Sequence, residues 1–457
     1  MNNETILLKL NSTDPSEKIE AIETFFDRDL TQDFAVAVTK QITDQDKGVR
    51  NAAATILAMK CDQYACKELV PYIASVDISV RNLAGEILIR NGSKSVPALL
   101  EYLKKGNDDD KKFIIDVLGL IEDPSASPDI LEILKVNKNE NVILACLEAL
   151  GRLKHKVAVD DIIEKYDENE LYKPTAIEAL GSIGTNDCLD FIALRFSEED
   201  ELTKYSMIEA LGLLGLPDTI EFLVQHMDEC EESLIIPTIG AVYSLADKYS
   251  IFPVITDKIK SAVLHTILEG EIGYKRAAIS LAGDLNDKEY LLAILSVFGI
   301  DLGLDEQIKT ILYNEPLFVL KYTPELLAKN DKYSLGLLTL IKDVILSNAE
   351  LFESEIDHTT FKNMLNAIAE NLNNSDEEAR RSAMELLFVL DMETGLLFLD
   401  TMLEDDNLWN KMRLIDILEE VFDERADDAL RKLSGESESM ISERATSILE
   451  NRTVSNI

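Results

Sequence analysis

The feature that most limits the possible folds of this chain is a sequence repeat of about 31 residues. Most copies begin with a basic residue, followed by small or apolar residues three, four, six and seven positions later and often by glycine at position eight. The clearest copies are Lys173–Gly181, Lys204–Gly212 and Lys275–Gly283. Repeats of this length are typical of elongated proteins in which each unit packs only against its neighbours. The repeat therefore predicts a solenoid.

Each unit is predicted to be a helix, a turn and a second helix. The apolar positions three, four and seven share one face of the second helix. An earlier apolar segment such as Phe191–Leu194 precedes it, across an acidic turn such as Ser197–Glu201. Acidic residues suit the positive N-terminal end of a helix, and the glycine either lets two backbones approach closely or ends the helix. One helix pair cannot cover its own apolar face, so neighbouring pairs must stack.

We count roughly fourteen units and predict an all-α fold, a right-handed α-solenoid of helix-turn-helix repeats. The repeats are regular over residues 1–285, irregular over 286–372, where a bend is possible and an additional helix is predicted around 342–356, and regular again over 373–457. Because no flexible linker interrupts them, the three sections are expected to form one continuous solenoid. Other copies in this register begin at Arg50, Arg81, Lys111, Ile143, Arg380 and Lys411. A degenerate first copy begins at Lys18, and weaker matches begin at Ile236, Asp305, Lys332 and Ser442.

The segments Asp44–Ala53 and Ala176–Gly184 resemble HEAT-like repeats of the short type found in bilin lyases. The likeness extends over nearly the whole chain and is strongest over residues 33–285 and 373–450. The resemblance implies the solenoid fold. It leaves the function open, because arrays of this kind serve as scaffolds, chaperone-like factors, lyases and a few enzymes.

The chain is strongly acidic, with 45 Lys and Arg against 85 Asp and Glu and a formal net charge of −40. Nucleic acids and anionic membranes attract basic surfaces, so we expect neither as a partner. A basic protein partner would be attracted instead. Five cysteines without a disulfide pattern, no signal peptide and no apolar segment of transmembrane length predict a cytoplasmic protein. The oligomeric state stays open.

Residues spaced for catalysis or metal binding are not evident. The four histidines, which include His155 and His226, are scattered, and none is followed by the glutamate that the HEAT-like deoxyhypusine hydroxylases use to bind iron. The Cys61 and Cys66 pair has no second pair to complete a zinc site. Phosphate-binding, dinucleotide-binding and nucleophile-elbow motifs are missing. We therefore expect a protein that is not an enzyme and has no cofactor or metal.

The second helix of each unit is expected to line a concave groove, as it does in HEAT arrays, with positions one, two and five facing away from the core. Position five is acidic in five successive repeats, and we call these side chains the acidic ladder: Glu86, Asp116, Glu148, Glu178 and Glu209. Glu385 and Asp416 occupy the same position later in the chain. Glutamate also forms helices well on any solvated face, so the ladder alone does not establish a site.

Apolar side chains share the predicted groove with the acidic ladder. Positions one or two hold Leu83, Phe113, Leu144 and Tyr205. Exposed apolar residues among carboxylates indicate a protein-interaction surface. By contrast, the basic residues Arg50, Arg81, Lys111, Lys173 and Lys204 are predicted to form ion pairs between repeats, because each lies beside an acidic turn.

The sequence thus predicts a non-enzymatic scaffold or adaptor that binds a partner protein with basic and apolar residues in the groove. Two alternatives stay open: a bilin-lyase-like or chaperone-like factor acting on a chromophore protein, and an architectural array without a preferred partner. A bound pigment would favour the lyase. The predicted partner-binding residues are Leu83, Glu86, Phe113, Asp116, Leu144, Glu148, Glu178, Tyr205 and Glu209.

Overall fold

The computed structural model describes residues 1–328, 333–348 and 355–455, and the regular secondary structure of these residues is entirely helical. The predicted all-α fold is confirmed. The chain divides into two compact units, Met1–Pro253 and Val254–Ile457. Residues 329–332 and 349–354 belong to the section predicted to be irregular; Lys332 and part of the additional helix predicted around 342–356 lie outside the described residues.

The first unit is a stack of eight helix pairs, in which an odd-numbered helix is followed by its even-numbered partner. In order, the helices are α1 Asn3–Leu10, α2 Pro15–Glu23, α3 Gln32–Lys40, α4 Lys47–Lys60, α5 Gln63–Leu69, α6 Ile78–Asn91, α7 Val96–Leu103, α8 Asp108–Ile121, α9 Ser127–Val136, α10 Glu140–Arg152, α11 Val159–Glu168, α12 Lys173–Ile183, α13 Asn186–Arg195, α14 Glu201–Leu214, α15 Asp218–His226 and α16 Glu232–Tyr249.

The described part of the second unit holds six further pairs, and two short helices, α26 and α27, together take the place of one first helix. These pairs bring the described total to fourteen, in agreement with the repeat count. The helices are α17 Asp257–Glu269, α18 Ile272–Ala282, α19 Lys288–Ser296, α20 Leu302–Leu312, α21 Pro316–Leu327, α22 Ser334–Ser347, α24 His358–Glu370, α25 Glu377–Leu390, α26 Met392–Leu397, α27 Leu399–Leu403, α28 Leu408–Glu419, α29 Glu424–Ser434 and α30 Ser439–Ser455.

The polar turn between the two helices of a repeat fixes where the second helix begins. The side chain of Asp46 accepts a hydrogen bond of 3.0 Å from the backbone N–H of Val49 at the start of α4. Asp200 does the same for Thr203 at 2.8 Å in α14. Such caps satisfy N–H groups that have no partner within the helix. The acidic turns of the sequence therefore act mainly as helix caps.

Successive second helices pack on each other through the glycine at position eight. A Cβ atom on Gly151 of α10 would lie 2.7 Å from the Cα of Ala179 in α12. A Cβ on Gly119 of α8 would meet the Cα of Ala149 at 3.2 Å. Real Cβ atoms do not approach a backbone within 2.7 Å, and 3.2 Å is tighter than most real contacts, so glycine allows the helices to pack this closely. The predicted close approach of backbones is confirmed.

Some of the basic residues form the predicted ion pairs between repeats. Lys173 lies 2.9 Å from Glu199 of the next repeat, and Arg81 lies 3.6 Å from Asp110. Arg50 differs, because its guanidinium donates to backbone carbonyls of its own repeat, including that of Asp44 at 2.7 Å. These contacts tie the turns of the stack together rather than presenting charge to a ligand.

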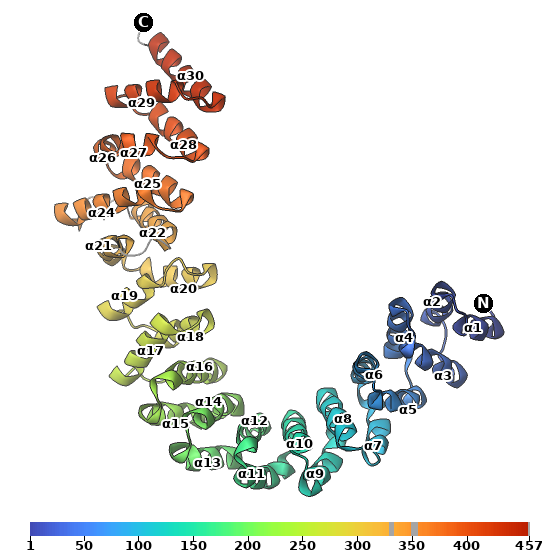
Figure 1. Cartoon of the computed structure of the whole chain (residues 1–457). Coiled ribbons are helices and arrows are strands. Elements are labelled where there is room, and N and C mark those ends of the chain that lie inside the picture. Colours follow the sequence, from blue (N-terminus) through green and yellow to red (C-terminus); the bar gives the residue numbers. More distant parts are fainter. Residues whose placement is uncertain (329–332, 349–354, 456–457) are drawn as a thin grey trace. The chain divides into compact units, whose positions relative to one another are not determined.

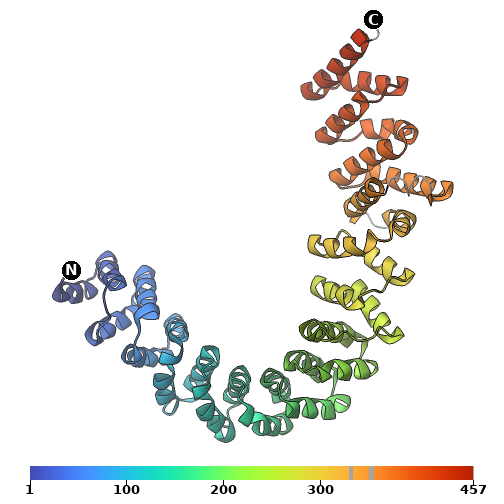
Figure 2. The same cartoon turned by 180° about the vertical axis from the view of Figure 1, so that it is seen from behind.

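In the first unit, the helices α4, α6, α8, α10, α12 and α14 lie side by side on the inner side of the curved stack, and α3 to α15 of the odd series lie on its outer side (Figures 1 and 2). We call the exposed surface of α6 to α14 on that side the inner face. Each inner helix packs directly on the next, so residues at one repeat position form a row across the inner face.

Candidate functional site

The five carboxylates of the acidic ladder belong to five neighbouring inner helices, α6, α8, α10, α12 and α14. Four of them are exposed, and Asp116 is half-buried. Because they occupy the same position in successive repeats, they form the row that the sequence predicted. The ion pairs of each carboxylate determine how much negative charge the row offers to a partner.

Three ladder carboxylates are already neutralised by a cation one turn away on the same helix. Such pairs between exposed side chains each stabilise a helix by only about 0.3–0.5 kcal/mol, but they reduce the negative charge offered to a partner. The pairs are Glu86 with Arg90 at 2.6 Å, Asp116 with Lys112 at 2.7 Å, and Glu148 with Arg152 at 2.8 Å.

The other two ladder carboxylates, Glu178 and Glu209, are exposed and form no ion pair or hydrogen bond with any residue in the described part of the chain. Arg152 is a cation near Glu178: its hydrogen bond with Glu148 raises its pKa, and the charge of Glu178 adds to that rise. The two ladder carboxylates without an ion pair or hydrogen bond therefore lie on α12 and α14, and Arg152 of α10 acts on one of them, Glu178, only at longer range.

Asp116 experiences a different environment from the rest of the ladder. Burial raises the pKa of its carboxyl group, and the nearby charge of Glu148 raises it further, against the opposing effect of Lys112. A carboxylate that is costly to ionise and already paired with lysine is poorly suited to bind an external cation.

Two hollows open on the inner face between neighbouring helices. The hollow between α12 and α14 has a volume of about 300 Å³ and contains both carboxylates that have no partner. We call it the α12–α14 hollow. It is lined by Pro174, Thr175, Glu178, Tyr205, Ser206, Glu209, Ala210 and Leu213.

The second hollow, between α8 and α10, has a volume of about 220 Å³ and contains two paired carboxylates together with their cations. We call it the α8–α10 hollow. Gly119 and Ala149 line it and lie against each other, so small side chains at positions eight and six deepen the surface here. The lining is Lys112, Asp116, Gly119, Leu120, Ala145, Glu148, Ala149 and Arg152.

The four predicted apolar anchors do not share one environment. Tyr205 is 43% exposed and lines the α12–α14 hollow, whereas Leu83, Phe113 and Leu144 are half-buried. The ring of Phe113 covers Gly85 of the preceding inner helix, where an added Cβ would lie 3.0 Å from the ring. Phe113 therefore already serves the packing between repeats, and a role in partner binding stays a prediction.

Two exposed apolar residues of the inner face were missed in the sequence. Leu120 and Leu213 are 49% and 58% exposed, and each lines one of the two hollows. Both stand at position nine, one residue beyond the motif that ends at the glycine. Extending the comparison of repeats by one position would have found them.

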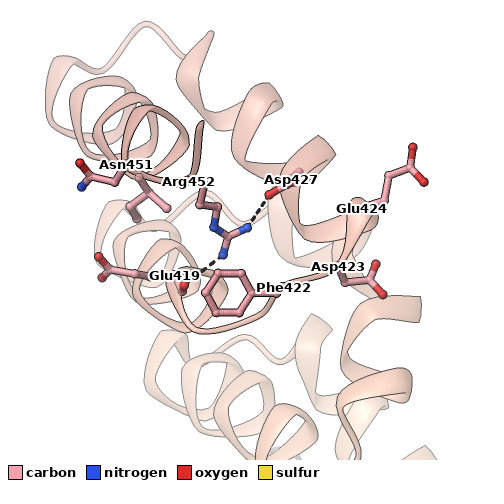
Figure 3. A pocket seen from close by; sticks show the side chains of 8 residues that line it. Glu419, Phe422, Asp423, Glu424, Asp427, Asn451 and Arg452 are labelled. Atoms are coloured by element: carbon pink, nitrogen blue, oxygen red, sulfur yellow. Dashed lines mark hydrogen bonds and ion pairs between the residues drawn. The ribbon is translucent and has the colours of Figure 1, made fainter. Parts of the chain in front are cut away.

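The second unit also has a hollow, of about 520 Å³, beside α28, α29 and α30 (Figure 3). Arg452 pairs with Asp427 and donates to the backbone carbonyls of Glu419 at 3.0 Å and Val421 at 2.9 Å. Its guanidinium lies 5.0 Å from the centre of the Phe422 ring. The terminal nitrogens of Arg452 thus join α30 to α29 and to the end of α28, whereas its Nε is buried without a hydrogen-bond partner among the described residues.

The later carboxylates at position five are likewise paired. Glu385 lies 3.1 Å from Lys342 and 2.7 Å from Arg413. Asp416 lies 3.3 Å from Arg444. Both later carboxylates at position five are therefore neutralised, unlike Glu178 and Glu209 of the first unit.

Features typical of a metal centre are not found in the part of the chain that the structure describes, where no three His, Cys, Asp or Glu side chains gather around one point. The sulfur atoms of Cys61 and Cys66 lie 3.4 Å apart and are buried. Among the described helices, none is long and apolar enough to cross a membrane.

Comparison with known proteins identifies the repeat. Residues 96–170 and 161–237 match the family model of HEAT repeats. No curated protein matches the sequence. Similar solved structures include Kap121p bound to Pho4p, with 12% identity, coverage of 98% of this chain and 52% of that chain, and a TM-score of 0.42. Another is importin beta crystallised with ammonium sulfate, with 10% identity, coverage of 97% and 69%, and a TM-score of 0.40.

A third similar structure is the complex of CpcE and CpcF of phycocyanin lyase from Nostoc sp. PCC7120, with 18% identity, coverage of 52% of this chain and 94% of that chain, and a TM-score of 0.30. Similarity at these levels carries no functional argument. The family assignment instead rests on the matched repeats themselves. Residues 96–237, which contain both hollows of the inner face, are HEAT repeats.

Proposed function

We propose that this protein is a non-enzymatic scaffold or adaptor whose inner face, in the first unit, binds a partner protein. The observation that carries the proposal is the pair of hollows between neighbouring inner helices, both lined by ladder carboxylates and by exposed apolar side chains. HEAT-repeat solenoids typically present such extended surfaces to other proteins.

The apolar residues of the two hollows supply the main source of affinity in this proposal. Leu120, Tyr205 and Leu213 are all about half exposed, and each would be covered by a partner segment that lies along the inner face. Burying apolar area contributes about 25 cal/mol per Å², and aromatic side chains are frequent among residues that dominate binding. Apolar side chains on the partner would complement these positions.

The charges of the inner face favour a basic partner. The net charge of −40 attracts cations over a long range, and the unpaired carboxylates Glu178 and Glu209 provide a local target. Such charges mainly raise the association rate and select among partners, because exposed ion pairs contribute little affinity. The partner is therefore a protein segment that carries basic and apolar side chains together.

Affinity capture with matched variants tests this proposal. The inner-face variant combines Leu120→Ala, Tyr205→Ala and Leu213→Ala. The control combines Val136→Ala and Leu194→Ala, which remove exposed apolar groups from the outer helices α9 and α13. Proteins captured from native lysate are identified by mass spectrometry, and the binding of each candidate is then measured again with purified components.

We expect a partner that binds wild type and the outer-face control but binds the inner-face variant at least about tenfold more weakly. Circular dichroism and thermal unfolding establish that both variants are folded. Equal binding by all three proteins would exclude the inner face as the docking surface. A small coloured ligand in place of a protein would favour the lyase alternative.

A further inference from the structure

The two hollows of the inner face are built from the same repeat positions, but only the α8–α10 hollow has lysine and arginine in its lining. In both, position five of each flanking helix is a carboxylate: Asp116 and Glu148 in one, Glu178 and Glu209 in the other. The two sites can therefore be compared position by position within one molecule.

The α8–α10 hollow supplies its own cations. Lys112, at position one of α8, lies 2.7 Å from Asp116. Arg152, at position nine of α10, places its terminal guanidinium nitrogen 2.8 Å from Glu148 and its Nε 3.3 Å from the same oxygen. In this hollow, each carboxylate at position five thus pairs with a lysine or arginine one turn away on its own helix.

The α12–α14 hollow lacks both cations. Position one of α12 is Pro174 and position nine of α14 is Leu213, so apolar groups stand where Lys112 and Arg152 stand in the other hollow. Its volume is larger, about 300 Å³ against about 220 Å³. It retains two exposed carboxylates, and it adds the exposed ring of Tyr205.

We propose that the α12–α14 hollow receives an arginine side chain of the partner protein, which supplies to its carboxylates the positive charge that Arg152 and Lys112 supply in the α8–α10 hollow. The proposal rests on the proposed function, because it specifies the chemistry of the partner at one point of the inner face. Glu178 and Glu209 pair with the guanidinium from the two flanking helices, and Tyr205 and Leu213 contact its apolar stem and its plane.

Arginine fits this hollow better than lysine does. A guanidinium is planar, donates from several N–H groups and stacks on aromatic rings, whereas an ammonium is a compact and strongly hydrated charge. The hollow offers a ring, on which a guanidinium can stack, and two separate carboxylates, which can accept from its several N–H groups. Lysine is expected to bind there more weakly.

Peptide binding to the full chain tests the inference. The probe is a blocked peptide with one arginine between two leucines in a Gly/Ser context, and its analogues replace arginine with lysine or with neutral citrulline. Ligand-observed NMR measures binding at about 50 mM and about 300 mM salt. We expect binding in the order arginine, lysine, citrulline, with a loss at the higher salt concentration.

Two variants locate the peptide on the protein. Glu178→Gln with Glu209→Gln removes both carboxylates of the hollow and is expected to weaken arginine binding about tenfold or more. Glu132→Gln with Glu164→Gln removes the same charge from exposed positions of the outer helices α9 and α11 and is expected to leave binding within about twofold. Equal losses in the two variants would mean that only the overall negative charge attracts the peptide.

A third variant transfers a cation into the hollow. Leu213→Arg places an arginine at the position that Arg152 occupies in α10, and folding should tolerate it because Leu213 is exposed. The introduced guanidinium is expected to pair with Glu209 and to abolish peptide binding. Undiminished binding by this variant, or no arginine-dependent binding by wild type, would overturn the inference.

The same variants separate this inference from the proposed function. If the captured partner is lost from the Leu120→Ala/Tyr205→Ala/Leu213→Ala variant but retained at full affinity by Glu178→Gln/Glu209→Gln, the inner face binds the partner without the arginine contact, and this inference fails alone. If both variants retain the partner, the proposed function fails as well.

Discussion

Gly181 of α12 lies against the backbone of Ala210 in α14, so closely that a Cβ atom on residue 181 would come within 2.7 Å of the Ala210 Cα and 2.9 Å of its carbonyl oxygen. Ala210 also lines the α12–α14 hollow. The glycine and alanine of successive repeats therefore set the helix spacing at the point where the candidate site is formed. The same contact therefore affects both the stability of the helix stack and the shape of the candidate site.

Gly181→Ala is expected to destabilise the first unit by about 1–3 kcal/mol, because the added methyl group forces two helices apart in a packed contact. Thermal unfolding followed by circular dichroism measures the change. Gly273→Ala is the matched control, since a Cβ there would meet nothing within 4 Å. Alanine at this exposed helical position should be neutral or stabilising by up to about 1 kcal/mol. Equal stability of the two variants would refute the packing role of Gly181.

Asp405→Asn tests the corresponding contact between repeats in the second unit. Arg380 forms a paired contact with Asp405, at 2.9 Å from Nε and 3.0 Å from a terminal nitrogen. Both side chains are largely buried, but Arg380 also pairs with Asp406 at 2.9 Å, so loss of the charge-assisted hydrogen bonds to Asp405 is expected to cost about 1.5–3 kcal/mol. Faster hydrogen exchange in α25 and α28 would report the local loss, and unchanged exchange there would show that the pair does not stabilise the stack.

The same pair predicts a dependence on pH. Burial disfavours the ionised form of Asp405, but hydrogen bonds from Arg380 and Asn410 outweigh it and lower the pKa of this carboxyl group. A lowered folded-state pKa stabilises the protein above the ordinary Asp value of about 4, and this stabilisation is lost as the pH falls through the lower folded-state value. The free energy of unfolding of wild type should therefore fall by this contribution on acidification, whereas that of Asp405→Asn should not. Parallel profiles of unfolding free energy against pH for the two proteins would show that Asp405 does not contribute this stability.

Cys61 and Cys66 are expected to form a disulfide when the protein is treated with oxidised glutathione. Hydrogen bonding with Cys61 lowers the pKa of Cys66, and thiolates attack disulfides. Because both sulfurs are buried, attack requires transient opening of the short helix α5. Cys66 then forms a mixed disulfide, and the Cys61 sulfur displaces glutathione from it.

Peptide mass spectrometry distinguishes the products of this reaction. Wild type should lose two hydrogens between Cys61 and Cys66, whereas Cys61→Ser should retain glutathione on Cys66. Cys146 is an internal reference, because burial raises the pKa of its thiol and should keep it unreactive. Reaction of Cys146 as fast as Cys66 would show that the pair has no special reactivity.

Much of the fold could be predicted from the sequence because the repeat motif contains the residues through which neighbouring repeats pack. The basic residue, the acidic turn and the glycine at position eight each have a local physical role, which Lys173, Asp200 and Gly151 confirm. These roles depend only on contacts within a repeat or with the next repeat, so they recur along the sequence at the repeat length and can be recognised there. The acidic ladder followed from the same periodicity.

The chemistry of the candidate site could be predicted only in part. Periodicity places Glu148 and Glu178 at the same position, but it does not show that Arg152 pairs with the first and leaves the second without a partner. Nor does it show that the Phe113 ring covers Gly85 instead of standing free. The first difference depends on which residue stands four positions further along the same helix, and the second on side chains of adjacent helices, which lie about 30 residues apart in sequence.

Site-specific photocrosslinking at position 205 tests the central claim most directly. A photoreactive phenylalanine analogue replaces Tyr205 in the α12–α14 hollow, and the same analogue replaces Leu194 on the outer helix α13 as a control. The account predicts one dominant protein crosslinked at position 205, absent at position 194, with the crosslinked peptide containing an arginine next to apolar residues. The same proteins crosslinked at both positions, or no crosslink at position 205 in a complex that forms, would contradict it.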